Sequence, residues 1–292
     1  MAAAPDGTPH VVFVHGLWVH SSAWDNWRRL YTDSGYVTHA PGWPGDADTV
    51  ADTRANSAAL ADHGVAEVTE HYAAYIRGLP TVPIIVGHSF GGLIAQKLLG
   101  MGLARACVAI SPAQFQGNRR VPLRQLRTAS PVLFHPGLRH KTWAHTKDSF
   151  HAGFANGVSR EESDDIYDRY IIPAPARPLF EAAVANLVPH SPTHVDVQAT
   201  RGPLLLIAGQ ADRTVPASAV RAAYKKQRRN IAVTETVTVP HAGHSYVLDA
   251  EWRTVAELAL SFLARQGAFP AEITPDRSAL GARELRTPDS HR

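Results

Sequence analysis

Short apolar runs alternate with amphipathic stretches along most of the chain. Apolar runs predict buried strands, and apolar residues that recur at helical spacing predict helices. The predicted strands cover residues 11–14, 36–40, 82–86, 106–110, 204–208 and 234–239, and the predicted helices cover residues 23–33, 65–78, 90–99, 217–227 and 248–264. This alternation is typical of a parallel sheet with right-handed crossover helices. We therefore expect an α/β fold with a doubly wound, mostly parallel sheet of about six strands.

The alternation stops between Ile110 and Leu204. The interval 111–202 holds 92 residues, whereas one crossover helix with its loops needs only about 20 to 30. Helical pieces separated by prolines are predicted at 123–127, around 143–154, at 161–170 behind the capping-box start at Ser159, and at 179–186. We expect a helical cap at 111–199, inserted into a core made of residues 8–110 and 200–267.

The end of the chain differs in composition from this core. After Gln266 the sequence is polar and rich in turn residues, so 268–292 is expected to be a tail that is mobile or lies on the surface. The first residues lack the basic and long apolar segments of a secretion signal, and no stretch reaches the roughly 18 apolar residues of a membrane span. The single cysteine, Cys107, lies in an apolar run and cannot form an internal disulfide. These features predict a cytoplasmic protein with a buried thiol.

Charge excludes one large class of partners. The formal net charge is only +3, with 45% hydrophobic and 19% charged residues, as in an ordinary soluble globular protein. The basic residues at 119–120 and 225–229 form short clusters, which are expected to be solvated helix faces and not a continuous stripe. Nucleic-acid binding is therefore not expected.

One motif at a predicted strand–helix junction indicates catalysis. Gly87-His88-Ser89-Phe90-Gly91 places a serine between two glycines. A strand that turns at once into a helix holds its serine in strained backbone geometry with Oγ projecting from the sheet edge, and the glycines let neighbouring backbone approach. The pattern predicts a nucleophile elbow with Ser89 as the nucleophile. The alternative is a tight turn with an inert serine.

A serine hydroxyl is a poor nucleophile at neutral pH, so a histidine base is expected near it. Among 16 histidines, His244 stands between the last predicted strand and the last predicted helix. Catalytic groups gather there, beyond the carboxyl ends of parallel strands. His241 is the rival and is expected to be structural. A metal site built on His241 and His244 is not expected, because no carboxylate follows at ligand spacing.

The acid that orients the base should follow another strand. Asp212 stands four residues after the predicted strand 204–208, in a turn that contains Gly209. Its structural alternative is an N-cap or turn role for the following helix. Asp249 and Glu251 are weaker candidates, because on the helix after His244 they would point away from its Nδ1.

Two backbone N–H groups should face the oxyanion that forms during acyl transfer. Phe90 would supply one of them at a helix N-terminus, where the helix dipole adds positive potential. The second is expected from the loop after the first strand, which reads His15-Gly16-Leu17-Trp18. Leu17 is the expected donor, with Trp18 as second choice.

Taken in order, four motifs resemble those of the α/β-hydrolase fold family over roughly residues 8–265. They are His15-Gly16, Gly87 to Gly91, Gly209-Gln-Ala-Asp212 and Gly243-His244. The resemblance implies a serine hydrolase without metal or organic cofactor, with the cap as the roof of its substrate pocket. It is similar to the smaller branch that includes esterases and hydroxynitrile lyases. Dehalogenases and epoxide hydrolases of this fold carry Asp where this chain has Ser89.

The expected reaction is hydrolysis of a carboxylic ester, lactone or thioester through an acyl-enzyme on Ser89, with a small-molecule acyl substrate. Trp18, Trp43 and Trp143 predict an apolar or aromatic pocket. The histidines of the cap are expected at the surface (His135, His140, His145, His151, His190 and His194). Two alternatives stay open: a lyase, acyltransferase or cyclase that uses the same triad, and a binding protein with a vestigial triad.

Overall fold

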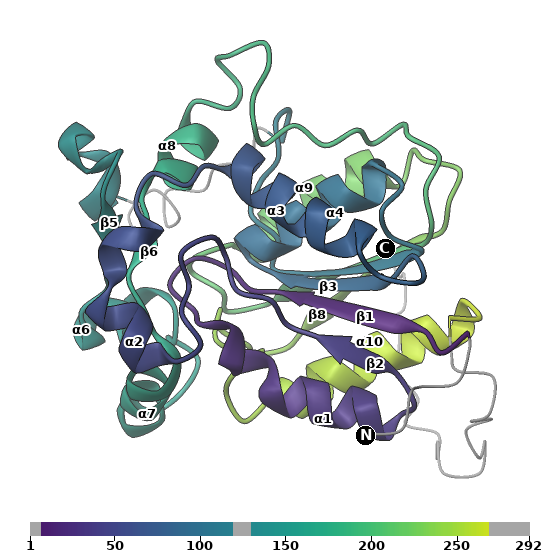
Figure 1. Ribbon diagram of the computed structural model, residues 1–292, viewed down its shortest axis with the longest axis horizontal. Helices are drawn as coiled ribbons and strands as arrows, with labels where there is room; N and C mark the ends of the chain where they lie inside the picture. The colour runs from purple at the N-terminus through teal and green to yellow at the C-terminus, as the bar shows by residue number, and fades with distance from the viewer. Residues whose placement is uncertain (1–6, 119–129, 269–292) are drawn as a thin grey trace, which may run out of the picture.

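A six-stranded sheet in the order β2-β1-β3-β4-β7-β8 forms the centre of the molecule. The computed structural model describes residues 7–118 and 130–268 (Figure 1). The strands are β1 (His10–Val14), β2 (Val37–His39), β3 (Ile84–His88), β4 (Ala106–Ile110), β7 (Leu204–Gly209) and β8 (Thr234–Val239). Every neighbouring pair is parallel. The predicted parallel sheet of about six strands is confirmed.

Helices cover both faces of this sheet. Helices α1 (Asp25–Asp33) and α10 (Trp252–Arg265) lie on one face, and α3 (Val65–Arg77), α4 (Phe90–Gly100) and α9 (Ala217–Gln227) lie on the other (Figure 1). Successive strand residues point to opposite faces, so Val11 and Phe13 pack with α1 and α10, while Val12 and Val14 pack with the other helices. Because the central strands are covered on both sides, they read as continuous apolar runs.

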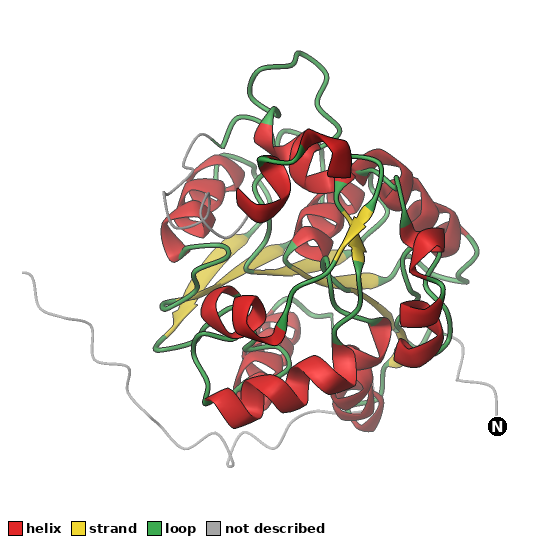
Figure 2. Cartoon of the chain, turned by 90° about the vertical axis from the view of Figure 1, so that its left-hand side faces the viewer, coloured by secondary structure: helices red, strands yellow, loops and turns green. Residues whose placement is uncertain are grey.

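A long insertion, defined here as residues 111–203, separates β4 from β7. Its described elements are the 3-10 turn Pro136–Leu138, β5 (Thr142–Trp143), α6 (Lys147–Gly153), α7 (Arg160–Tyr170), β6 (Ala174–Pro175) and α8 (Arg177–Ala183). Strands β5 and β6 pair antiparallel in a small separate sheet. Figure 2, which looks onto this end of the molecule, shows the small sheet in front of the main one.

Polar contacts join the insertion to the sheet domain. Arg54, on the short helix α2 (Val50–Ala55), donates to the carbonyls of Tyr167, Asp168 and Ile171 at the end of α7. The buried carboxylate of Glu181 on α8 accepts from the first N–H of α3, at 2.8 Å from Val65 N. A carboxylate at a helix N-terminus also interacts favourably with the helix dipole.

Several predicted boundaries were wrong. The stretch 143–154 is not helical throughout, because Trp143 belongs to β5 and α6 begins only at Lys147, where Thr146 and Ser149 form a capping box. The last helix begins at Trp252, four residues after the predicted Leu248. Helix α2 and the 3-10 turn Ser57–Leu60 were not predicted. The helix expected at 123–127 and residues 269–292 of the expected tail lie outside the described residues.

The approach of α4 to the end of β1 gives a testable prediction. A Cβ on Gly91 would overlap the carbonyl oxygens of Val14 and His15, which belong to buried backbone. We expect Gly91→Ala to lower the free energy of unfolding in urea by about 3 kcal/mol. Gly137→Ala is the control, because a Cβ there meets nothing within 4 Å. Equal free energies of unfolding in the two variants would contradict the close backbone contact at Gly91.

Candidate active site

The serine of the predicted elbow lies at the junction of β3 and α4. Ser89 has φ 56° and ψ −122°, a backbone conformation that costs about 1 to 3 kcal/mol for a residue other than glycine. Its N–H donates to Ile110 O at 3.0 Å, and its carbonyl accepts from the N–H groups of Gly92, Leu93 and Ala113. Four backbone hydrogen bonds therefore hold the strained residue in place.

A buried carboxylate–imidazole pair lies near this serine. His244 Nδ1 is 2.7 Å from Asp212 Oδ2, and neither side chain is exposed to solvent. The other carboxylate oxygen, Asp212 Oδ1, accepts from the backbone N–H groups of Thr214 at 2.8 Å and Val215 at 2.7 Å. In a neutral ring whose Nδ1 donates to Asp212, Nε2 is the nitrogen that carries the lone pair. This Nε2 is buried and has no hydrogen-bond partner among the described residues.

Two residues that the sequence analysis missed support the acid. Ser111 Oγ donates to Asp212 Oδ2 at 2.7 Å, and the Tyr246 hydroxyl lies 3.0 Å from Ser111 Oγ. Burial raises the pKa of Tyr246 well above its usual value, so its hydroxyl stays protonated. Ser111 directly follows β4, at the sheet edge from which Ser89 and Asp212 also emerge. That position in the sequence is the signal that could have revealed it.

Aromatic rings surround the imidazole of His244. The His88 ring lies 4.5 Å from it between centroids, and Phe154 of the insertion packs edge to face at 4.6 Å. Burial and the nearby His244 lower the pKa of His88 well below its usual range. His88 is therefore neutral at physiological pH. Because His88 directly precedes Ser89, its ring contact with His244 places the imidazole near the nucleophile candidate.

The loop after β1 lies directly against the nucleophile candidate. A Cβ on Gly16 would be 2.7 Å from Ser89 Cβ. The backbone N–H groups of Leu17 and Phe90 donate no hydrogen bond to any residue that the structure describes. The two expected oxyanion donors are therefore both available for a ligand.

The rival candidates lie apart from this arrangement. His241 is exposed, with φ 59°, and its backbone N–H donates to Gln210. Asp249 accepts from Ser245 Oγ at 2.6 Å and from the N–H of Glu251. Burial raises the pKa of Asp249. Its partners are thus local, and the carboxylate that meets His244 is Asp212.

Trp18 and Trp143 of the predicted pocket contact each other. The Trp18 indole N–H donates to Trp143 O at 3.2 Å, and the rings pack edge to face at 5.6 Å. His145 lies 4.5 Å from both rings and is only 3% exposed. The expected surface position of this histidine was wrong. Burial, with a smaller contribution from His244, lowers the pKa of His145 to about 3.

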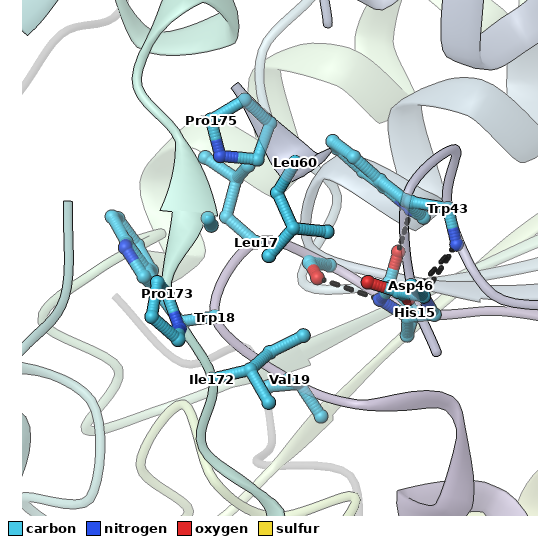
Figure 3. A pocket seen from close by; sticks show the side chains of 12 residues that line it. His15, Leu17, Trp18, Val19, Trp43, Asp46, Leu60, Ile172, Pro173 and Pro175 are labelled. Carbon is cyan, nitrogen blue, oxygen red and sulfur yellow. Dashed lines mark hydrogen bonds and ion pairs between the residues drawn. The ribbon is translucent and has the colours of Figure 1, made fainter. Parts of the chain in front are cut away.

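A small pocket lies beside the loop after β1 (Figure 3). Trp18 and Trp43 line it, whereas Trp143, Ser89 and His244 do not. The remaining lining residues are His15, Gly16, Leu17, Val19, Asp46, Leu60, Ile172, Pro173, Ala174 and Pro175. Because Ser89 and His244 do not line this pocket, the role of the three tryptophans in substrate binding stays a prediction.

Comparison with known proteins establishes the family. A family model described as the alpha/beta hydrolase family matches residues 11–258. The chain therefore belongs to the α/β hydrolase family. No curated protein sequence matches it.

Solved structures agree on the fold. A monoacylglycerol lipase from Paleococcus ferrophilus has a TM-score of 0.62 and 19% identity, over 89% of this chain and 96% of that one. A methylesterase from Arabidopsis has a TM-score of 0.62 and 13% identity, over 88% and 100%. A thermophilic esterase from Thermogutta terrifontis has a TM-score of 0.60 and 17% identity, over 89% and 91%. At these identities the similarity concerns the fold.

Within 7–118 and 130–268, no three His, Cys, Asp or Glu side chains are grouped so that they could hold a metal ion. None of the helices in these ranges has the length and apolar character needed to span a membrane.

The buried His145 makes stability depend on pH. In the unfolded chain its pKa is about 6.5, so the unfolded state binds a proton that the folded protein, with a pKa of about 3, does not. This contribution to stability is complete above about pH 7 and is lost as the pH falls toward 3. It amounts to about 2 kcal/mol between pH 7 and 5.

We expect His145→Gln to flatten the dependence of unfolding free energy on pH between 4 and 6, by at most about 1.4 kcal/mol per pH unit. Urea titrations at several pH values measure this slope. His190→Gln, at an exposed position, should keep the wild-type slope. An unchanged slope in His145→Gln would show that this histidine is not the group that resists protonation.

Proposed function

We propose that this chain is a serine hydrolase that cleaves a small-molecule carboxylic ester, lactone or thioester through an acyl-enzyme on Ser89. The observation that carries the proposal is the buried pair of Asp212 and His244, whose Nε2 has no hydrogen-bond partner among the described residues, close to a serine in strained geometry. A neutral imidazole with one nitrogen fixed by a carboxylate and the other free is the arrangement of a general base. Membership of the α/β hydrolase family supports the same role.

The reaction follows from these groups. His244 Nε2 takes the proton of Ser89 Oγ as Oγ attacks the acyl carbonyl, and Asp212 stabilises the resulting imidazolium. The N–H groups of Leu17 and Phe90 stabilise the tetrahedral oxyanion. Nε2 then gives its proton to the leaving oxygen or sulfur. Water attacks the acyl-enzyme with the same base and releases the acid, and none of these steps requires a metal or organic cofactor.

Ser89 Oγ and His244 Nε2 form no hydrogen bond in this structure, since Nε2 has no partner among the described residues. Catalytic hydrogen bonds are commonly long or misaligned in a free enzyme and tighten when substrate binds. The proposal therefore requires that the serine rotamer or the imidazole adjusts to form this hydrogen bond when an acyl group enters.

We assign residues 111–199 of the insertion as a cap over a hydrolase core formed by 8–110 and 200–267, with 268–292 as a tail. Phe154 of the insertion packs on the His244 ring, and Asn156 donates to Ala211 O at 2.9 Å, next to Asp212. The aromatic rings of Trp18, Trp43 and Trp143 then favour an apolar or aromatic substrate. A cytoplasmic location is consistent with the buried, unpaired Cys107.

A non-hydrolytic lyase, acyltransferase or cyclase is the second candidate. One observation favours it: His244 is fully buried and Ser89 is only 5% exposed. A site that excludes water protects an acyl-enzyme from hydrolysis and lets another nucleophile compete. A binding protein with a vestigial triad is disfavoured, because serine, base, acid and two free N–H groups are all present.

Turnover of p-nitrophenyl esters from acetate to decanoate tests the proposal. We expect Ser89→Ala and His244→Ala each to lower kcat by at least about 10⁴-fold, and Asp212→Asn by about 10⁴-fold through loss of the correct tautomer. The control is His241→Asn. Asparagine tolerates the positive φ of this position, so the variant should retain wild-type turnover. Unchanged turnover in Ser89→Ala would contradict the assignment of Ser89 as the nucleophile. Triad-dependent acyl transfer to an added alcohol without hydrolysis would favour the second candidate.

A further inference from the structure

We propose that Asp46 and His15 are positioning residues that set the direction of the Leu17 N–H toward the reacting carbonyl. This inference rests on the proposed function, in which that N–H is an oxyanion donor. Asp46 follows β2 and had no role in the sequence analysis. It lies with His15 at one side of the pocket in Figure 3.

The side chain of His15 holds the peptide that joins Gly16 to Leu17. His15 Nδ1 is 2.9 Å from Gly16 O, and a carbonyl oxygen can only accept, so Nδ1 donates. The Gly16 carbonyl and the Leu17 N–H belong to the same planar trans peptide and point in opposite directions. A hydrogen bond that fixes the oxygen therefore also fixes the N–H. Since Gly16 lies against Ser89, this peptide borders the nucleophile.

The imidazole of His15 is held in turn by the carboxylate of Asp46. His15 Nε2 is 3.0 Å from Asp46 Oδ2, and each side chain is 3% exposed. At that distance the imidazole and the carboxylate form a buried, hydrogen-bonded pair. The backbone N–H of Trp43 lies 2.9 Å from Asp46 Oδ2 and 3.2 Å from His15 Nε2. The carboxylate thus holds the ring in the position from which Nδ1 donates to Gly16 O.

Trp43 adds further contacts that hold His15 and Asp46 in place. The Trp43 indole donates to His15 O at 3.1 Å, and its ring lies 5.7 Å from the imidazole. A Cβ on Gly42 would be 2.7 Å from Asp46 Cβ, so the aspartate packs closely against the backbone of Gly42, where a larger residue would displace it. The loop after β2 therefore holds His15 through both its backbone and its side chain.

Asp46→Asn tests the inference with almost no change of shape. The atom that replaces Oδ2 can accept from Trp43 N–H or donate to His15 Nε2, but it cannot do both. Removing one oxyanion donor costs about 10²- to 10³-fold in kcat, so we expect misdirecting one to lower kcat by about 10- to 100-fold, with KM within about twofold. Asp48→Asn, at an exposed position of the same loop, is the matched control and should match wild type.

A transition-state analogue separates positioning from a general structural role. In a trifluoromethyl ketone, Ser89 Oγ bonds to the carbonyl carbon, the serine proton passes to His244 Nε2, and the carbonyl oxygen becomes an oxyanion. We expect Asp46→Asn to raise the Ki of this ketone by the same factor that kcat falls. The Ki of the matching methyl ketone should stay unchanged. Unchanged kcat, or equal increases in both Ki values, would overturn the proposal.

Substitution of His15 supplies a second test if Asp46→Asn does not fold. The amide nitrogen of His15→Asn takes the place of Nδ1 and can donate to Gly16 O, whereas His15→Leu cannot. We expect His15→Asn to retain at least about ten times the kcat of His15→Leu, and equal kcat values would overturn the proposal. Wild-type protein with neither ester turnover nor a trifluoromethyl ketone adduct would instead refute the proposed function, and this inference with it.

Discussion

The strained turn at Ser89 depends on direct backbone contact among β1, β3 and α4. A Cβ on Gly87 would overlap the carbonyl of Gly91, and a Cβ on Gly91 would overlap the carbonyl of Val14. Only glycines let these segments come so close. The contact brings the N-terminus of α4 and the loop after β1 to the same serine, so the backbone conformation of Ser89 and its two neighbouring N–H groups arise from one packing arrangement.

Around that turn, polar support extends outward from each functional group. Asp212 accepts from four donors, one of which is Ser111 on the loop after the neighbouring strand. On the other side, Asp46 holds His15 and His15 holds Gly16. A buried polar group that loses its partner is costly, so these paired groups resist rearrangement of the site. In the proposed reaction, this resistance keeps the donors in place before charge develops.

The features that a local sequence pattern determines were predicted best. The sheet, its helices and the turn at Ser89 follow from periodicity and paired glycines, and the meeting of His244 with Asp212 follows from their positions after neighbouring strands. Trp143 was misassigned to a helix because β5 forms only by pairing with β6, 31 or more residues later. The burial of His145 and the pairing of Asp46 with His15 depend on contacts between distant segments, which no periodicity encodes.

The most direct test of the central claim is the site of covalent labelling by a fluorophosphonate. Nucleophilic attack on phosphorus expels fluoride and leaves one phosphonyl group on the attacking oxygen, which peptide mass spectrometry locates. We expect a single adduct on the peptide that contains Ser89, with a labelling rate at least about 10³-fold lower in His244→Ala. An adduct on another residue, or ester turnover that persists after Ser89 is fully labelled, would contradict the role of Ser89 as the nucleophile.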